Sequence, residues 1–132
     1  MEKPVIIEGR VVGGLSLGRK LGFPTANIML PPEAQRLRDG VYFGRATLPG
    51  GDRYYALINV GNRPTVSRVR EPLLEAYLIG FSGSLYEEVL RVELLEYMRG
   101  ERKFDDLEGL KRAMEKDLEK AEQLIEKYGS GL

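Results

Sequence analysis

The sequence predicts a mainly β domain, a small antiparallel barrel or sandwich, followed by one long C-terminal helix. Short runs rich in β-branched and aromatic residues recur along the first hundred residues, separated by turn-forming Gly, Pro, Asn and Ser. Near the C-terminus the apolar residues change to helical spacing. A chain of 132 residues can form one well-packed core and is too short for two ordinary domains. We therefore expect a single domain over residues 1–132, with the barrel at about 4–98 and the helix at about 106–128.

At least five strands are expected, and their close spacing favours antiparallel meanders. The runs are "PVIIEGRVV" at 4–12, "GVYFGRATL" at 40–48, "RYYALINVG" at 53–61, "PLLEAYLIGF" at 72–81 and "EVLRVELLEYM" at 88–98. The last run also fits helical spacing, but the alternation from Val89 to Leu94 favours a strand.

The C-terminal helix is predicted by apolar residues at intervals of three or four. They are Leu107, Leu110, Met114, Leu118, Ala121 and Ile125. Asp105 and Glu108 are predicted to form an N-terminal capping pair, and Gly129 suits the end of the helix. A helix that follows a β-domain usually buries its apolar stripe on that domain, so we expect it to pack on the barrel. A partner-binding or membrane face is the alternative.

The composition excludes several function classes. Cysteine and histidine are absent, which rules out a disulfide framework, thiolate or histidine metal sites and histidine-based catalysis. Twenty basic and twenty acidic residues give no net charge and no block of one sign to attract nucleic acid. No apolar run approaches the roughly 20 residues of a membrane helix. We expect a cytoplasmic protein whose general base, if it has one, is a carboxylate.

The segment at 13–22 holds four glycines beside Arg19 and Lys20. Glycine lets backbone N–H groups approach a phosphate closely, and the two cations could neutralise its oxygens. The segment lacks the Gly-Lys-Ser/Thr ending of a Walker A loop. It is either a phosphate cradle or a glycine-rich hairpin between two strands.

The tetrapeptide "PTAN" at 24–27 places a hydroxyl and an amide two residues apart. In extended chain Thr25 and Asn27 project from the same face. Their neutral oxygens are ligands that Mg²⁺ accepts when nucleotide phosphates complete its coordination shell. The alternative is a turn in which Thr25 and Asn27 cap backbone groups.

Glu75 lies in the apolar run at 72–81, where an acidic side chain needs a reason. Desolvation there would hinder its ionisation and make it a better proton acceptor near neutral pH. Glu75 is therefore the candidate general base. The alternative is an outward-pointing residue on the solvent face of an alternating strand.

The turn at 98–105 combines three cations with one aromatic ring. Phe104 could stack on a flat heterocycle while Arg99 or Arg102 steers a phosphate. Phe104 could equally be the hydrophobic residue that packs against the start of the helix, with the cations solvated.

These pieces occur in one order along the chain. They are the glycine-rich segment, "GFPTAN", "INVGNRPT", "LLEAYLIGF" and the stretch from Leu85 to Ala121, which includes "RGERKFDDL". The whole pattern resembles riboflavin kinase, the flavokinase of bacterial and eukaryotic type, including the C-terminal half of bifunctional FAD synthetases. The resemblance covers Ile6 to Ile125, although Gly100 stands where the family usually has proline.

The resemblance implies a six-stranded antiparallel Greek-key barrel with the C-terminal helix packed on it. It also implies transfer of the ATP γ-phosphate to the ribityl 5′-hydroxyl of riboflavin, which makes FMN and ADP. By this resemblance Glu75 is the catalytic base, and Thr25 and Asn27 hold Mg²⁺ or another divalent cation. The implied ATP-binding residues are Gly14, Gly18, Arg19, Thr25, Asn27, Leu78 and Tyr86. Those on the flavin side are Arg99, Arg102 and Phe104.

The expected partners are two small molecules, riboflavin and ATP, with no nucleic acid, no membrane and a monomeric state. Because the chain begins directly before the barrel, FMN and not FAD is the expected product. A non-catalytic β-barrel that binds a flavin or nucleotide, with Glu75 merely structural, is the main alternative. An RNA-binding barrel is disfavoured by the neutral charge and by the lack of alternating basic and aromatic residues on the strands.

Overall fold

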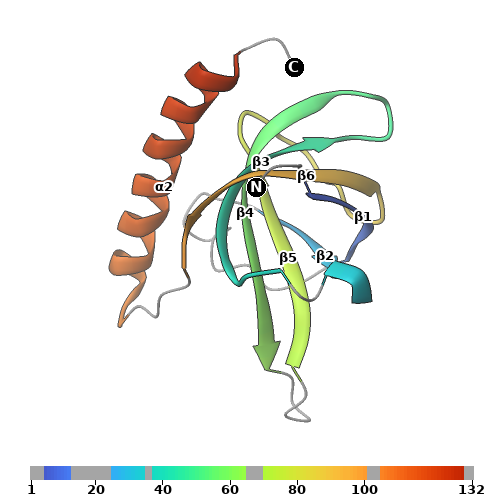
Figure 1. Cartoon of the computed structure of the whole chain (residues 1–132), viewed down its shortest axis with the longest axis horizontal. Helices are drawn as coiled ribbons and strands as arrows, with labels where there is room; N and C mark the ends of the chain where they lie inside the picture. The colour runs from blue at the N-terminus through green and yellow to red at the C-terminus, as the bar shows by residue number, and fades with distance from the viewer. Residues whose placement is uncertain (1–4, 13–24, 35–36, 65–69, 101–104, 130–132) are drawn as a thin grey trace.

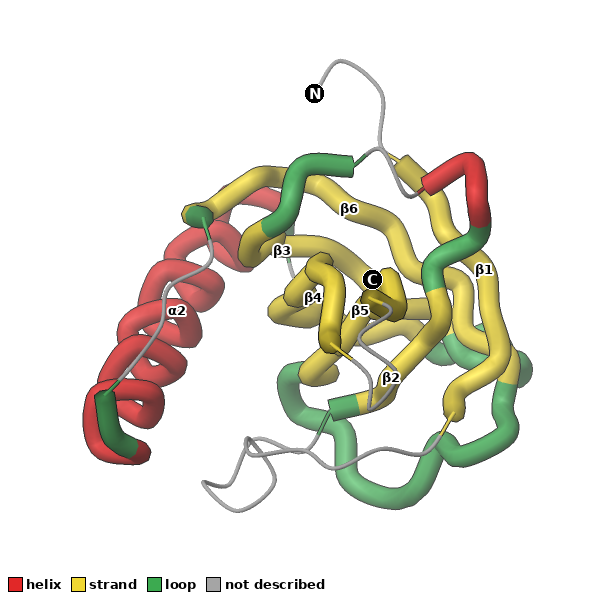
Figure 2. The backbone as a smooth tube through the Cα atoms, turned by 90° about the horizontal axis from the view of Figure 1, so that it is seen from below, coloured by secondary structure: helices red, strands yellow, loops and turns green. Residues whose placement is uncertain are grey.

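The structure, a computed structural model, describes residues 5–12, 25–34, 37–64, 70–100 and 105–129. Six strands close into an antiparallel barrel, and one helix lies beside it (Figure 1; Figure 2). The elements are β1 Val5–Val12, β2 Ala26–Met29, a 3-10 turn Pro32–Ala34, β3 Gly40–Thr47, β4 Arg53–Pro64, β5 Arg70–Leu78, β6 Val89–Arg99 and α2 Leu107–Tyr128. The predicted barrel with a C-terminal helix is confirmed.

The order of strands around the barrel is β1-β2-β5-β4-β3-β6. Strands β3, β4 and β5 are consecutive hairpin neighbours, and β6 returns by a longer connection to lie beside β3. This arrangement is a Greek key. Strand β2 has only four residues, which explains why it was not among the apolar runs that predicted strands. It pairs with β5 and thereby joins two distant parts of the chain.

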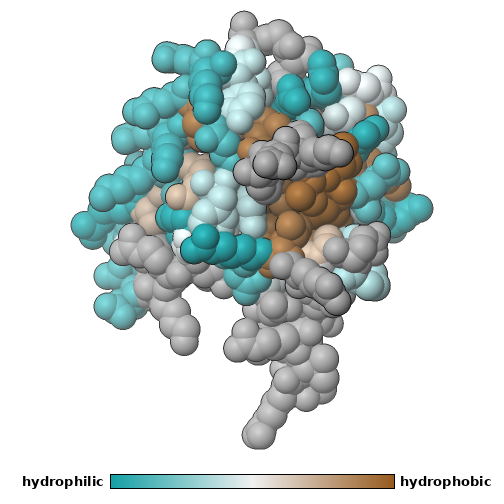
Figure 3. All heavy atoms as spheres, in the orientation of Figure 1, coloured by the Kyte–Doolittle hydropathy of each residue, from teal (hydrophilic) through white to brown (hydrophobic). Residues whose placement is uncertain are grey.

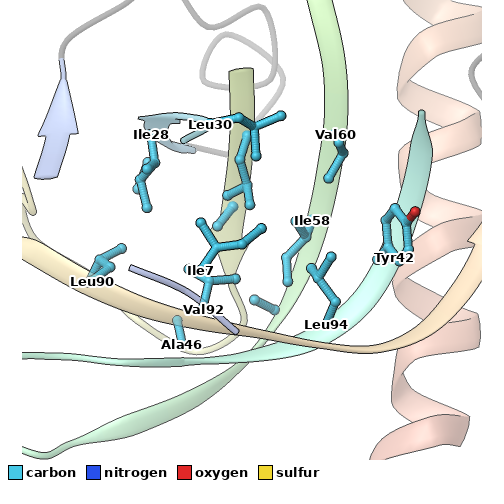
Figure 4. Packing of buried hydrophobic residues seen from close by; sticks show 14 of the residues in the cluster. Ile7, Ile28, Leu30, Tyr42, Ala46, Ile58, Val60, Leu90, Val92 and Leu94 are labelled. Atoms are coloured by element: carbon cyan, nitrogen blue, oxygen red, sulfur yellow. The ribbon is translucent and has the colours of Figure 1, made fainter. Parts of the chain in front are cut away.

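The barrel interior is filled by alternate residues of the strands, as the two-residue period of a strand requires. Figure 4 shows these side chains converging on the centre of the barrel. The members that are at most 2% exposed include Ile7, Ile28, Ile58, Val60, Leu74, Leu90, Val92 and Leu94. The residues between them therefore face outward, and any polar site on the strands must lie on the outer surface.

Helix α2 covers part of that outer surface, as predicted. Phe43, Tyr55 and Leu57 of the barrel form a second apolar cluster with Ala121 of the helix. The hydroxyl of Tyr55 also donates a hydrogen bond to the carbonyl of Gly129, at 2.6 Å. The opposite side of the helix is hydrophilic (Figure 3), so the apolar stripe of α2 is used for packing within the domain.

Two details of the predicted helix are wrong. Asp106, and not Asp105 with Glu108, caps the N-terminus, because the Asp106 backbone is extended and its carboxylate accepts from Gly109 N at 2.8 Å. Leu107 is 49% exposed, since it occupies the first helical position, before the packed part of the helix. The predicted stop is confirmed: Gly129 has φ 93° and its N–H donates to the carbonyl of Ile125 at 2.7 Å.

Strands β4 and β5 continue past the barrel as a two-stranded ribbon, which extends downward in Figure 1. Their pairing runs from Ala56↔Leu78 to Pro64↔Arg70. Residues 61–64 therefore belong to regular strand. Within the residues that the structure describes, no helix is long and apolar enough to span a membrane.

Candidate active site

Three polar side chains form a row across the outer surface of the barrel. Asn27 of β2 pairs directly with Glu75 of β5, and Glu75 pairs directly with Asn59 of β4. Directly paired residues of an antiparallel ladder project from the same face. Their chain neighbours Ala26, Ile28, Ile58, Val60, Leu74 and Ala76 all belong to the interior core. Asn27, Glu75 and Asn59 consequently share the outward face.

Thr25 adds a hydroxyl beside this row. Its Oγ1 lies 3.4 Å from Oε2 of Glu75 and 3.5 Å from Oδ1 of Asn27. A hydroxyl has a single proton, so it donates to one of these oxygens at a time. Asn27 is only 3% exposed, while Thr25 and Glu75 are half-buried. Residues separated by 50 positions in the sequence are thereby brought together, so that Thr25 lies beside both Asn27 and Glu75 in the fold.

The environment of Glu75 has features of both predictions, a partly desolvated carboxylate and an outward-pointing side chain. The carboxylate does point outward, as an alternating strand requires, while Leu74 and Ala76 on either side are fully buried in the barrel. It is nevertheless half-buried, beside a hydroxyl and between two amides. Glu75 therefore stands in a polar cluster on the barrel surface rather than alone in bulk water.

The other predicted site residues have different positions. Gly14, Gly18, Arg19, Arg102 and Phe104 lie outside the described residues. Leu78 is 4% exposed and packs in the barrel interior, on the opposite face of the sheet from the outward row. Tyr86 is 60% exposed and lies in the connection between β5 and β6. The Leu78 side chain thus lies away from Thr25 and Glu75. No described contact joins Tyr86 to these two residues.

Arg99 lies at the far end of the same row. Val41 of β3 pairs with Asn59 on one side and with Arg99 of β6 on the other. The guanidinium of Arg99 binds the carboxylate of Asp117 on α2, with Nε–Oδ1 at 2.8 Å and Nη2–Oδ2 at 2.7 Å. This hydrogen bonding to Asp117 raises the pKa of Arg99 above its ordinary value. The predicted flavin-side arginine is therefore held by the helix.

Asn59 and Asp117 are two residues of this region that were not among the predicted site residues. Asn59 is in the quoted stretch "INVGNRPT", but its position opposite Glu75 depends on strand register, which sequence alone does not define. Asp117 lies four residues from both Ala113 and Ala121, so it falls on the buried side of the helix. That spacing is the signal that could have revealed it.

The oxygens of this cluster suit a hard divalent cation. A hydroxyl, an amide carbonyl and a carboxylate are the donor types that Mg²⁺ accepts, so Thr25 and Asn27, beside Glu75, fit a magnesium–nucleotide complex. Among the described residues, no group of three or more His, Cys, Asp or Glu side chains gathers in a metal-binding arrangement. The cation would accordingly take most of its ligands from phosphates and water, as Mg²⁺ commonly does with nucleotides.

Comparison with known proteins agrees with the family that the motifs indicated. A family model described as flavokinase, riboflavin kinase, matches residues 1–125. The chain belongs to the riboflavin kinase family. Membership of an enzyme family, as the sequence motifs predicted, is thereby confirmed.

Relatives within the riboflavin kinase family include larger proteins. The chain is 40% identical over 119 residues to a bifunctional riboflavin kinase/FMN adenylyltransferase of Haemophilus influenzae, covering 90% of the chain and 38% of that protein. It is 42% identical over 113 residues to the RNA-binding riboflavin kinase RibR of Bacillus subtilis, covering 86% of the chain and 48% of that protein. The chain therefore spans less than half the length of these two relatives.

The fold is also similar to that of a solved riboflavin kinase. The crystal structure of riboflavin kinase from Trypanosoma brucei superposes with a TM-score of 0.68 at 24% sequence identity, covering 95% of this chain and 82% of that one. At this identity the likeness supports the barrel and its helix, and the assignment to the family comes from the sequence matches.

Proposed function

We propose that this domain phosphorylates riboflavin, transferring the γ-phosphoryl group of ATP to the ribityl 5′-hydroxyl to give FMN and ADP, with Glu75 as general base. Family membership supports the two substrates. One observation carries the assignment of the base: Oε2 of Glu75 lies 3.4 Å from Oγ1 of Thr25, beside the amide of Asn27. Because Thr25 and Asn27 can bind the nucleotide side, the neighbouring carboxylate of Glu75 can contact the acceptor alcohol close to the phosphate.

Glu75 accepts the proton of the 5′-hydroxyl as the alcohol oxygen forms its bond to the γ-phosphorus. The bond between that phosphorus and the β,γ-bridging oxygen breaks, so ADP leaves and the proton remains on Glu75. Phosphoryl transfer through a loose transition state needs alignment and charge neutralisation more than covalent help from the protein. The work of Glu75 is therefore to orient and deprotonate the acceptor, which typically contributes about 10²- to 10⁴-fold.

Thr25 and Asn27 hold the nucleotide side of the site. When bound there, Mg²⁺ supplies positive charge that offsets the negative charge of the phosphates. The burial of Asn27 restricts its amide, and the hydroxyl of Thr25 lies within hydrogen-bonding distance of both Asn27 and Glu75. Thr25 thus connects the orientation of the base to that of the nucleotide ligands. In this proposal the domain acts as a cytoplasmic monomer on two small molecules.

The direct test is to incubate the purified chain with riboflavin, ATP and MgCl₂ and to separate the flavins by chromatography with mass detection. Stoichiometric formation of FMN and ADP is the expected result. A non-catalytic flavin- or nucleotide-binding barrel would instead quench riboflavin fluorescence or bind ATP without yielding FMN. That outcome would contradict the proposed function.

A further inference from the structure

Glu75 is flanked by an amide on each side. Asn27 lies directly opposite it on β2, and Asn59 lies directly opposite it on β4. Side chains in such pairs have Cβ atoms about 4.5–5.5 Å apart, so each amide is within reach of whatever binds the carboxylate. Figure 4 shows Ile58 and Val60 pointing into the barrel, and Asn59 between them consequently faces outward.

The two amides beside Glu75 differ in how accessible they are to a ligand. Asn27 is 3% exposed and interacts with Thr25, so its side is occupied by the predicted nucleotide ligands. Asn59 is exposed, and its side chain forms no hydrogen bond to another residue of the described part of the chain. If the nucleotide approaches Glu75 from the Asn27 side, the acceptor alcohol must approach from the side of Asn59.

An amide suits a chain of hydroxyl groups. It offers one carbonyl acceptor and two N–H donors, and each hydroxyl both donates and accepts. A polyol whose terminal oxygen sits on Glu75 carries its next hydroxyls within a few ångströms, comparable with the strand spacing of about 4.8 Å. An amide also carries no charge, so it cannot compete with Glu75 for the proton of the reacting hydroxyl.

The continuation of the row indicates the direction of the acceptor. Beyond Asn59 the paired residues are Val41, which is 7% exposed, and then Arg99. The row therefore changes from polar to apolar to cationic with increasing distance from Glu75. A molecule with a polyol tail and a flat ring fits this order when its tail lies over Asn59 and its ring lies towards β3 and β6.

We propose that Asn59 binds the 4′- and 3′-hydroxyls of the ribityl tail and thereby positions the 5′-hydroxyl on Glu75. This inference rests on the proposed function, because it assigns the acceptor half of the same site. Asn59 is in this role a specificity-determining residue: it distinguishes a polyol tail from a plain alkyl alcohol. It has no part in binding ATP.

The test compares two acceptors in two enzymes. The acceptors are riboflavin and a flavin with a 5-hydroxypentyl chain on N10, which keeps the terminal hydroxyl and lacks the others. We expect Asn59→Ala to lower kcat/KM for riboflavin about 3- to 10-fold per lost hydrogen bond. The value for the hydroxypentyl flavin should stay within about 2-fold, as should KM for ATP. The preference for riboflavin therefore shrinks.

Two further variants complete the experiment. Arg53→Ala removes an exposed side chain at the start of the same strand and should leave the preference unchanged. Asn59→Ser retains one hydroxyl and should recover part of the preference, provided that circular dichroism melting shows both Asn59 variants folded. Equal losses on both acceptors, or an unchanged preference in Asn59→Ala, would overturn the inference without contradicting the proposed kinase function. Absence of FMN with the wild-type chain would overturn the proposed function itself.

Discussion

The guanidinium of Arg99 and the carboxylate of Asp117 meet in a two-point contact, with both N···O distances below 3 Å. Their side chains are 25% and 11% exposed, so the pair is largely removed from water. The contact links the end of β6 to the middle of α2. Bidentate arginine–carboxylate pairs of this kind are stronger and more directional than single ion pairs. Arg99 therefore fixes the helix on the barrel, whatever it also does for a ligand.

Replacing Arg99 or Asp117 by alanine should lower the free energy of unfolding by unequal amounts. Arg99→Ala leaves the carboxylate of Asp117 mostly buried without its counter-charge, and we expect it to lower the free energy of unfolding by about 3 kcal/mol. Asp117→Ala leaves a longer side chain that can turn to solvent, so the expected cost is about 1–2 kcal/mol. Urea unfolding of both single variants and the double variant measures these values and their coupling. A larger loss in Asp117→Ala, or additive losses, would contradict this account.

Glu75→Gln tests the base directly. Glutamine preserves the size of the side chain and an acceptor for the Thr25 hydroxyl, but it cannot take up the proton. We expect kcat to fall about 10²- to 10⁴-fold, with ATP affinity changed less than about 3-fold. Steady-state kinetics and calorimetric titration with Mg-ATP provide the two measurements. Unchanged turnover would remove Glu75 from the role of base.

Thr25 should matter for the nucleotide through its hydroxyl. Thr25→Val has nearly the same shape and lacks Oγ1, whereas Thr25→Ser retains it. We expect Thr25→Val to weaken ATP binding in the presence of Mg²⁺ about 10- to 100-fold. The affinity of Thr25→Ser should remain within about 3-fold of that of the wild type. Titrating MgCl₂ at constant ATP, with calorimetry as well as activity, compares the two. Equal behaviour of the two variants would show that the hydroxyl is not used.

Much of the architecture follows from local sequence patterns. The alternation around Val89–Leu94 defines a strand, and the spacing of Leu118, Ala121 and Ile125 defines the buried side of the helix. The helix start was misplaced by one residue, because Asp105 and Asp106 are chemically equal candidates. The extended backbone at Asp106 and the hydrogen bond that its carboxylate accepts from Gly109 distinguish them.

The pairing of the site residues across the strands could be known only from the folded structure. That Thr25, Asn27 and Glu75 belong to one site was expected from the family motifs, but not that Asn59 completes the row. Strand β2 pairs with β5 only because the barrel closes, and the register of β4 against β5 depends on the same closure. A one-residue shift in that register would place Asn59 away from Glu75. No local pattern in "INVG" contains this information.

Alkaline pH should reveal the burial of Tyr42. This residue is 3% exposed and donates its hydroxyl to the carbonyl of Arg38 at 2.6 Å. Burial above all, and then the neighbouring Tyr97, raise the pKa of Tyr42 above the ordinary value of 10.0. The unfolded chain therefore releases this proton near pH 10 while the folded protein still holds it. Stability that is complete below pH 10 is lost as the pH rises towards the folded pKa.

Tyr42→Phe provides the matched comparison. At pH 8 the variant should be about 1 kcal/mol less stable, because it loses the hydrogen bond to Arg38. Above pH 10 its free energy of unfolding should fall less steeply than that of the wild type, by about 1.4 kcal/mol per pH unit. Urea unfolding at several pH values measures both slopes. Parallel slopes would show that Tyr42 ionises normally in the folded protein.

Gly44 lies where the barrel has no room for a side chain. A Cβ atom there would collide with the backbone carbonyl oxygen of Glu93 on β6 and would lie 2.6 Å from Cδ1 of Ile58. Both neighbours are held by the ladder and the core, so Gly44→Ala should cost about 3 kcal/mol. Gly50 has nothing within 4 Å of such an atom, and Gly50→Ala should stay within about 0.5 kcal/mol of the wild type. Similar urea midpoints for the two variants would mean that β3 and β6 lie farther apart than the structure has them.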